Sequence, residues 1–147
     1  MLKELLVAFV IIAVCLVLHV ASIVLIADWM LDQREKRKEQ MGMFGYMTLL
    51  IAAFSAIIIL HMMEIAIWAS FYFGNSLFAD FETALYFSTT SYTTIGFGDV
   101  VLPRSWRLLG GIEGVTGVLL CGLSTAFVFA IVNAMFQARL QRRTNSS

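Results

Sequence analysis

Apolar residues gather in three long runs, at about 5–31, 43–73 and 106–137, with a shorter amphipathic segment at about 79–92 between the second and third. About 20 consecutive apolar residues are enough for a helix to cross the hydrocarbon core of a bilayer. The pattern therefore predicts three transmembrane helices and one re-entrant element, which enters and leaves the membrane on the same side. Composition agrees, because 60% hydrophobic and 14% charged residues are outside the usual range of soluble domains.

The first apolar run is too long for a cleaved signal peptide. Leu5 to Ile26 contains 22 residues interrupted only by His19 and Ser22, whereas the core of a signal peptide has about 7 to 15. We therefore expect this helix to be retained.

Basic residues predict the orientation in the membrane. The one charge run between helices, Asp32 to Gln40, holds four basic residues, which places it in the cytoplasm by the positive-inside rule. Two further crossings bring the basic residues after the third run to the same side: Arg139, Arg142 and Arg143. The N-terminus then lies outside, the C-terminus lies in the cytoplasm, and the re-entrant element opens to the outer face.

A polar, glycine-rich segment follows the amphipathic stretch, and residues 93–99 read T-T-I-G-F-G-D. Gly96 and Gly98 allow backbone conformations with positive φ, so that successive carbonyls can point one way and form an oxygen-lined tube. Thr94 can add its hydroxyl to the tube, while Ile95 and Phe97 can pack outward. An inert turn is the alternative, but it leaves the hydroxyl-rich segment 88–93 just before the loop unexplained.

This segment resembles the selectivity filter of tetrameric potassium channels, whose related T-V-G-Y-G loop coordinates dehydrated K⁺. The resemblance covers roughly residues 43–137 and implies an all-α membrane protein with an outer helix, a pore helix, a filter and an inner helix, four copies of which surround one pore. It divides the chain into an extra N-terminal helix with a basic loop (1–42), the pore module (43–137) and a short cytoplasmic tail (138–147). The implied ion-coordinating residues are Thr94, Ile95, Gly96, Phe97 and Gly98.

The resemblance also implies a passive function in a plasma membrane, which the short chain suggests is prokaryotic. We expect a homotetramer in contact with lipid, with K⁺ as the transported ion, no cofactor, no nucleic acid and no enzymatic activity. A non-selective cation channel and a non-conducting membrane adaptor are the alternatives. No arginines recur at intervals of three in the first run, so no voltage sensor is expected there.

The filter region departs from the family pattern. Phe97 replaces the commoner tyrosine, Tyr86 and Phe87 stand where tryptophans are frequent, and Thr90 stands where many relatives have an acid. Fewer hydrogen bonds around the filter suggest the hypothesis that the filter is soft and takes part in gating. Asp99 has two interpretations, a ring of carboxylates at the outer mouth or a hydrogen bond that anchors the filter.

Ionisable residues inside membrane helices are costly and usually face protein or water. Glu64 and Glu113 are expected near the depth of the pore helix, and His61 lies on the same helical face as Glu64. His61 and Glu64 supply only two ligands, which is few for a metal site, so the favoured interpretation is one buried hydrogen-bonded network that supports the filter. A more specific hypothesis is that the ionisable groups of this network sense protons. His19 has no obvious partner in the sequence.

The third apolar run is rich in small residues. Five glycines, expected to allow close packing against the pore helix, are Gly110, Gly111, Gly114, Gly117 and Gly122. Gly117 or Gly122 could also be a bending point. A stripe at spacings of three and four is expected to line the inner cavity: Leu119, Gly122, Ala126, Ala130 and Ala134. Because Phe127 and Phe129 fall off this stripe, we expect a wide inner mouth and control at the filter.

Overall fold

The computed structural model describes residues 2–36 and 43–144, and within these ranges the chain is helical, with no strand. In chain order it forms α1 (Leu2–Lys36), α2 (Met43–Gly74), α3 (Phe81–Tyr92), a 3-10 turn η1 (Arg104–Trp106) and α4 (Arg107–Thr144). Three segments are long and apolar enough to cross a membrane: Lys3–Gln33, Phe44–Gly74 and Arg104–Gln137. The predicted all-α class with three membrane helices is confirmed.

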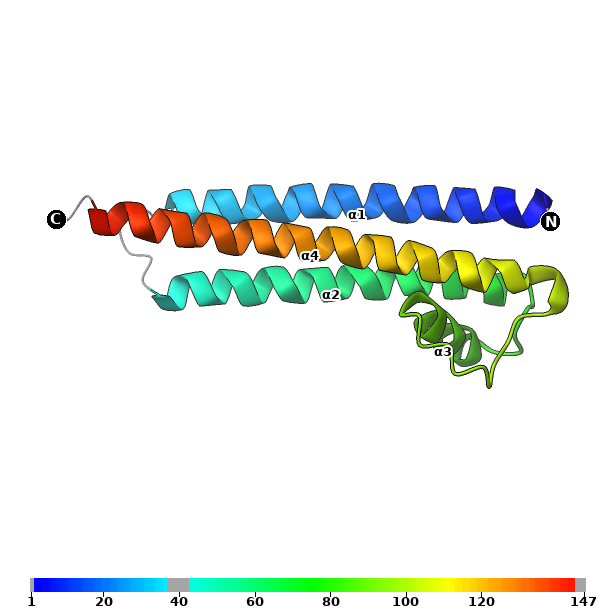
Figure 1. The fold of residues 1–147 in the computed structure, drawn as a ribbon. Coiled ribbons are helices and arrows are strands. Elements are labelled where there is room, and N and C mark those ends of the chain that lie inside the picture. Colours follow the sequence, from blue (N-terminus) through cyan, green and yellow to red (C-terminus); the bar gives the residue numbers. More distant parts are fainter. Residues whose placement is uncertain (1, 37–42, 145–147) are drawn as a thin grey trace.

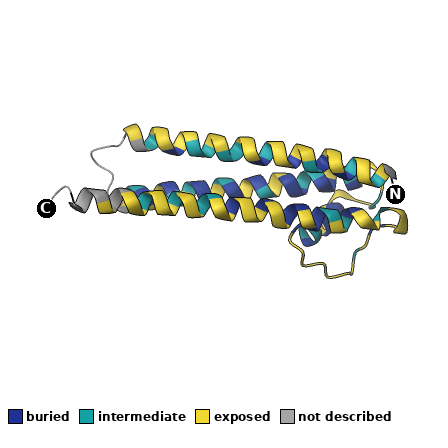
Figure 2. Cartoon of the chain, turned by 45° about the horizontal axis from the view of Figure 1, so that its top comes forward, coloured by how far each residue is buried: buried dark blue, intermediate teal, exposed yellow. Residues whose placement is uncertain are grey.

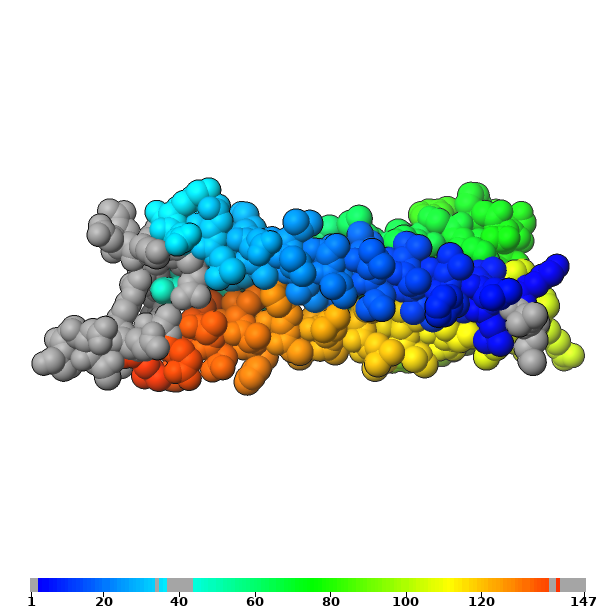
Figure 3. Space-filling model, turned by 90° about the horizontal axis from the view of Figure 1, so that it is seen from above, coloured from blue at the N-terminus to red at the C-terminus, as the bar shows by residue number. Residues whose placement is uncertain are grey.

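The three long helices run side by side, and α3 lies at one end of this bundle (Figure 1). α3 packs against α2 and α4, and α1 packs against both α4 and α2. Seen from another side, α1 and α4 lie next to each other along the length of the molecule (Figure 3). α3 is short and does not run the length of the bundle.

The three long helices alternate in direction along the bundle (Figure 1). The N-terminus lies at the end of the bundle that carries α3, whereas α1 ends and α2 begins at the opposite end (Figure 1). α4 also runs to that opposite end (Figure 1). The loop at 37–42 and the side chains of Arg139, Arg142 and Arg143 lie outside the described residues.

Buried side chains form two hydrophobic clusters, one on the α3 side and one toward the other end. The larger includes Trp68, Tyr72 and Leu109, and the smaller is centred on Met30 and Tyr46. Exposed residues lie along the outside of all three long helices (Figure 2), and many of them are large and apolar. Such continuous apolar exposure is unfavourable in water, and it fits a surface that faces lipid and neighbouring chains.

The start of α3 is fixed by a side-chain cap. Asp80 has an extended backbone and accepts hydrogen bonds from the Thr83 backbone N–H at 2.7 Å and from the Thr83 hydroxyl at 3.0 Å. The first of these bonds holds the pKa of Asp80 below its ordinary value. Asp80 is therefore the N-cap, and the acid in the first turn is Glu82, which interacts favourably with the helix dipole.

Three of the five glycines on α4 pack against α3. A Cβ at Gly110 would lie 3.0 Å from the Phe87 ring, one at Gly114 would lie 3.1 Å from the Ser91 carbonyl oxygen, and one at Gly117 would overlap the Tyr92 carbonyl group. Gly111 and Gly122 have no atom within 4 Å of such a Cβ. The expected close packing against the pore helix is confirmed for Gly110, Gly114 and Gly117.

Candidate functional site

The glycine-rich segment after α3 has an alternating backbone. φ is 59° at Thr94, 53° at Gly96 and 79° at Gly98, while the intervening Ile95 and Phe97 stay outside the positive region. Positive φ is easy for glycine but unusual for threonine, so the conformation at Thr94 has to be held by its surroundings.

Backbone hydrogen bonds hold the start of this segment against the end of α3. The Thr94 N–H donates to the Ser91 carbonyl and the Gly96 N–H donates to the Thr90 carbonyl, both at 3.0 Å. The last turn of α3 thus provides acceptors for the loop. Because a carbonyl oxygen has two lone pairs, each can still interact with another donor or with a cation.

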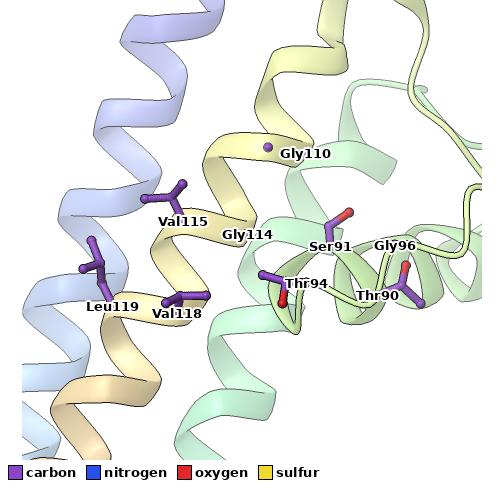
Figure 4. A pocket seen from close by; sticks show the side chains of 10 residues that line it. Thr90, Ser91, Thr94, Gly96, Gly110, Gly114, Val115, Val118 and Leu119 are labelled. Atoms are coloured by element: carbon purple, nitrogen blue, oxygen red, sulfur yellow. The ribbon is translucent and has the colours of Figure 1, made fainter.

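An open groove of about 450 Å³ lies between this loop and α4. Thr90, Ser91, Thr94 and Gly96 line one side, and Val115, Val118 and Leu119 of α4 line the other (Figure 4). Glycines at 110, 111 and 114 complete its wall. The Thr90 hydroxyl donates to the Phe87 carbonyl of its own helix at 3.0 Å. The Thr90 side chain, which stands where many relatives have an acid, therefore bonds within α3.

The predicted cavity stripe lies on an exposed face of α4. Leu119, Gly122, Ala126 and Ala130 are all exposed in the single chain, and so is Ala134. Phe127 is partly buried, whereas Phe129 is 71% exposed. The glycine-rich segment is also exposed in the single chain, where Phe97 is 69% exposed. These surfaces are available to neighbouring chains or to water.

Asp99, at the end of the glycine-rich segment, is held by the side chain of Tyr86, a contact that the sequence did not predict. The Tyr86 hydroxyl donates to Asp99 Oδ2 at 2.7 Å, and the Val100 N–H donates to Oδ1 at 3.0 Å. The bond from Tyr86 lowers the pKa of Asp99 below its ordinary value and raises that of Tyr86. The anchoring interpretation of Asp99 has a structural basis, and its exposed carboxylate stays charged at neutral pH.

Removing the Tyr86 hydroxyl should raise the pH at which Asp99 loses its charge. A carboxylate with a depressed pKa loses its charge, and the interaction it makes, only when the pH falls through that depressed value. In Tyr86→Phe the pKa of Asp99 returns toward its ordinary value, so we expect the Asp99 carboxyl to take up its proton at a higher pH, followed by NMR of the protein in detergent. Asp99→Asn should abolish this titration in both backgrounds, and an unchanged midpoint in Tyr86→Phe would contradict the assignment.

A first buried polar cluster, which we call the histidine cluster, brings together all four helices. It consists of His19, His61, Glu64, Tyr92 and Ser124. Glu64 contacts His19 Nδ1 through Oε1 at 2.8 Å and His61 Nδ1 through Oε2 at 3.0 Å. The Tyr92 hydroxyl donates to Glu64 Oε2, and Ser124 Oγ lies 3.2 Å from His19 Nε2 and 3.1 Å from His61 Nε2.

A second buried cluster, which we call the Glu113 cluster, is separate. Glu113 accepts hydrogen bonds from the Tyr72 hydroxyl at 2.8 Å and from the Ser88 hydroxyl. Ser88 also lies 2.9 Å from the Ile65 carbonyl. The single network expected from the sequence is thus two clusters, because Glu113 of α4 bonds Ser88, one turn before the end of α3, whereas Glu64 of α2 bonds the last residue of α3, Tyr92.

The structure also shows which partners the sequence analysis missed. His19, which had no assigned partner, contacts Glu64, and the hydroxyls of Tyr72, Ser88, Tyr92 and Ser124 complete the two clusters. One signal was present in the sequence, because both histidines of the chain lie within apolar runs, where an ionisable side chain needs a polar partner.

Fold and site together define a helical membrane protein with a short helix and a glycine-rich loop re-entering at one end of the bundle. A family model described as "Ion channel", of the two-helix potassium-channel pore-module type, matches residues 46–134. The match covers well over half of the chain and includes α3, the loop and most of α2 and α4. The chain belongs to this family of ion channels. No curated protein and no solved structure matches it significantly.

Proposed function

We propose that the protein is a potassium-selective channel made of four identical chains in a plasma membrane. The observation that carries this proposal is the segment T-T-I-G-F-G-D, with positive φ at Thr94, Gly96 and Gly98, held by the last turn of a re-entrant helix. Alternation of this kind lets consecutive carbonyls face the same side. Four such segments around one axis would replace the hydration shell of K⁺.

In this proposal the backbone oxygens of Thr94, Ile95, Gly96 and Phe97 coordinate the ion, together with the Thr94 hydroxyl. α3 directs the negative end of its dipole toward the base of the filter, where a cation arrives from the inner cavity. Asp99 adds negative charge at the outer mouth and raises the local cation concentration. The exposed stripe on α4 lines the inner cavity, and the groove beside Thr94 receives a neighbouring chain.

Reversal potential measured in liposomes under opposing K⁺ and Na⁺ gradients tests this function. We expect currents that reverse close to the K⁺ equilibrium potential. A reversal potential near zero would indicate a non-selective cation channel, and absence of current from correctly folded protein would indicate an adaptor. Cross-linking in the membrane should separately show four chains per complex, and a different number would contradict the assembly.

The filter is proposed to gate because Phe97 offers no hydroxyl at the position where relatives carry one. Its ring is exposed in the chain, so only a neighbouring chain could hold it. Phe97→Tyr adds a hydrogen-bonding group without changing the ring, and we expect it to increase open probability and slow inactivation in bilayer recordings. Tyr86→Phe is the opposing variant, since it removes a bond at the end of the filter. Identical gating in Phe97→Tyr and wild type would count against a soft filter.

A further inference from the structure

The histidine cluster contains both histidines of the chain, and both contact the same carboxylate. His19 comes from α1 and His61 from α2, and Glu64 lies between them. His19 and Glu64 are fully buried, and the His61 side chain is 15% exposed. Placing histidine or glutamate at this depth in a membrane protein costs free energy, and such residues commonly mark a functional site.

The ligand atoms of these three residues are close enough to share one ion. One ligand atom from each of His19, His61 and Glu64 lies within 4.8 Å of the others. A metal ion bonds imidazole nitrogen and carboxylate oxygen at about 2.0–2.2 Å, so sub-ångström side-chain adjustments would bring the three atoms around one centre. Two histidines and one glutamate form a known zinc ligand set that leaves a fourth position open.

The cluster has fewer hydrogens than its contacts require. With neutral histidines and an ionised Glu64, it holds four hydrogens, one on each imidazole, one on Tyr92 and one on Ser124. These four hydrogens face six short contacts between the five side chains. The His61 N–H can be shared between Glu64 and Tyr92, so at least one contact brings lone pairs together, which favours uptake of a cation into the cluster.

We propose that His19, His61 and Glu64 bind one divalent transition-metal ion of the zinc class per chain. Imidazole and carboxylate ligands suit Zn²⁺, Ni²⁺ and Co²⁺ better than Mg²⁺ or Ca²⁺, which prefer sites made of oxygen alone. The Tyr92 hydroxyl lies 2.9 Å from His61 Nδ1 and also bonds Glu64, so it is placed to reach the fourth position. Ser124 contacts both imidazoles and would orient them.

The position of this site gives α1 a role. His19 lies outside the matched family region of residues 46–134, yet it would supply one of the three ligands. Tyr92 is the last residue of α3 and precedes the filter segment. A bound ion would therefore link α1 and α2 to the end of the pore helix.

Metal binding to the purified, untagged chain in detergent tests the site directly. We expect one Zn²⁺ or Co²⁺ per chain by equilibrium dialysis with elemental analysis, with micromolar or tighter affinity, and visible absorption typical of tetrahedral Co²⁺. His19→Gln and Glu64→Gln, which keep polar side chains of similar shape, should each weaken binding on the order of 100-fold. Mg²⁺ should not compete.

Glu113→Gln is the matched control, because it removes the second buried carboxylate among the described residues and leaves all three ligands in place. It should bind the metal like wild type. Absence of stoichiometric binding to folded wild-type protein would overturn the proposal. Equal loss in Glu113→Gln and Glu64→Gln would also overturn it. The measurement needs no ion flux, so it stands or falls separately from potassium selectivity.

Discussion

Gly117→Ala is expected to destabilise the folded channel by about 3 kcal/mol or more. A Cβ at this position would overlap the Tyr92 carbonyl oxygen and lie 2.9 Å from its carbonyl carbon. Both are backbone atoms at the end of α3, so no side-chain rotation can relieve the overlap. Overpacking in a rigid core costs about 1–3 kcal/mol and occasionally more, and we expect the upper end here because α3 would have to move away from α4. The measurements are thermal stability in detergent and K⁺ flux in liposomes.

Gly122→Ala provides the matched control on the same helix. No atom lies within 4 Å of a Cβ at Gly122, and alanine is favoured over glycine in helices by about 1 kcal/mol. This variant should therefore keep or gain stability. If Gly117→Ala is as stable as Gly122→Ala, the close approach of α4 to the Tyr92 carbonyl would be contradicted. A bend at Gly117 is also disfavoured, because α4 is one continuous helix and its glycine there is explained by packing.

Much of the fold could be predicted because hydropathy and glycine placement are strong local signals. The three apolar runs became α1, α2 and α4, and the amphipathic segment at 79–92 became α3, which begins two residues later than expected because Asp80 caps it. The glycine-rich segment at 93–99 could be recognised from its glycine placement. Two glycines separated by a single residue allow the alternating positive φ that the structure shows.

Side-chain pairing between helices could not be predicted in the same way. An almost wholly apolar helix such as α2 gives little indication of which face meets which neighbour. The contact between His19 and Glu64 and the bond from Tyr86 to Asp99 both depend on how the helices are rotated and shifted relative to one another. For that reason the sequence indicated that His61, Glu64 and Glu113 need polar partners, but it did not reveal two clusters.

The two polar clusters and Gly117 of α4 all contact the same short helix, α3. The histidine cluster contacts α3 through Tyr92, the Glu113 cluster contacts it through Ser88, and Gly117 packs on the Tyr92 carbonyl. α3 in turn provides the carbonyls that hold Thr94 and Gly96. The conformation of the loop that follows α3 is thereby linked to polar contacts with α1, α2 and α4.

Glu113→Ala should be the second most damaging substitution. Glu113 is fully buried and accepts hydrogen bonds from Tyr72 and Ser88, so its removal leaves a cavity and a tyrosine hydroxyl that has lost its acceptor. Ser88 keeps the nearby Ile65 carbonyl as an alternative acceptor. An unsatisfied buried donor costs about 1–3 kcal/mol, and the cavity adds to this. We expect a loss of about 3 kcal/mol in unfolding free energy, measured by titration with denaturing detergent.

A double-mutant cycle with Tyr72→Phe separates the hydrogen bond from the cavity. In wild type, Tyr72→Phe removes one donor from a buried carboxylate and should cost about 1–3 kcal/mol. In the Glu113→Ala background the same change removes a hydroxyl that has already lost its acceptor, so it should cost almost nothing or restore some stability. The two changes would then be strongly non-additive, as expected for residues in direct contact. Additive effects would mean that the Tyr72 hydroxyl and Glu113 do not stabilise one another.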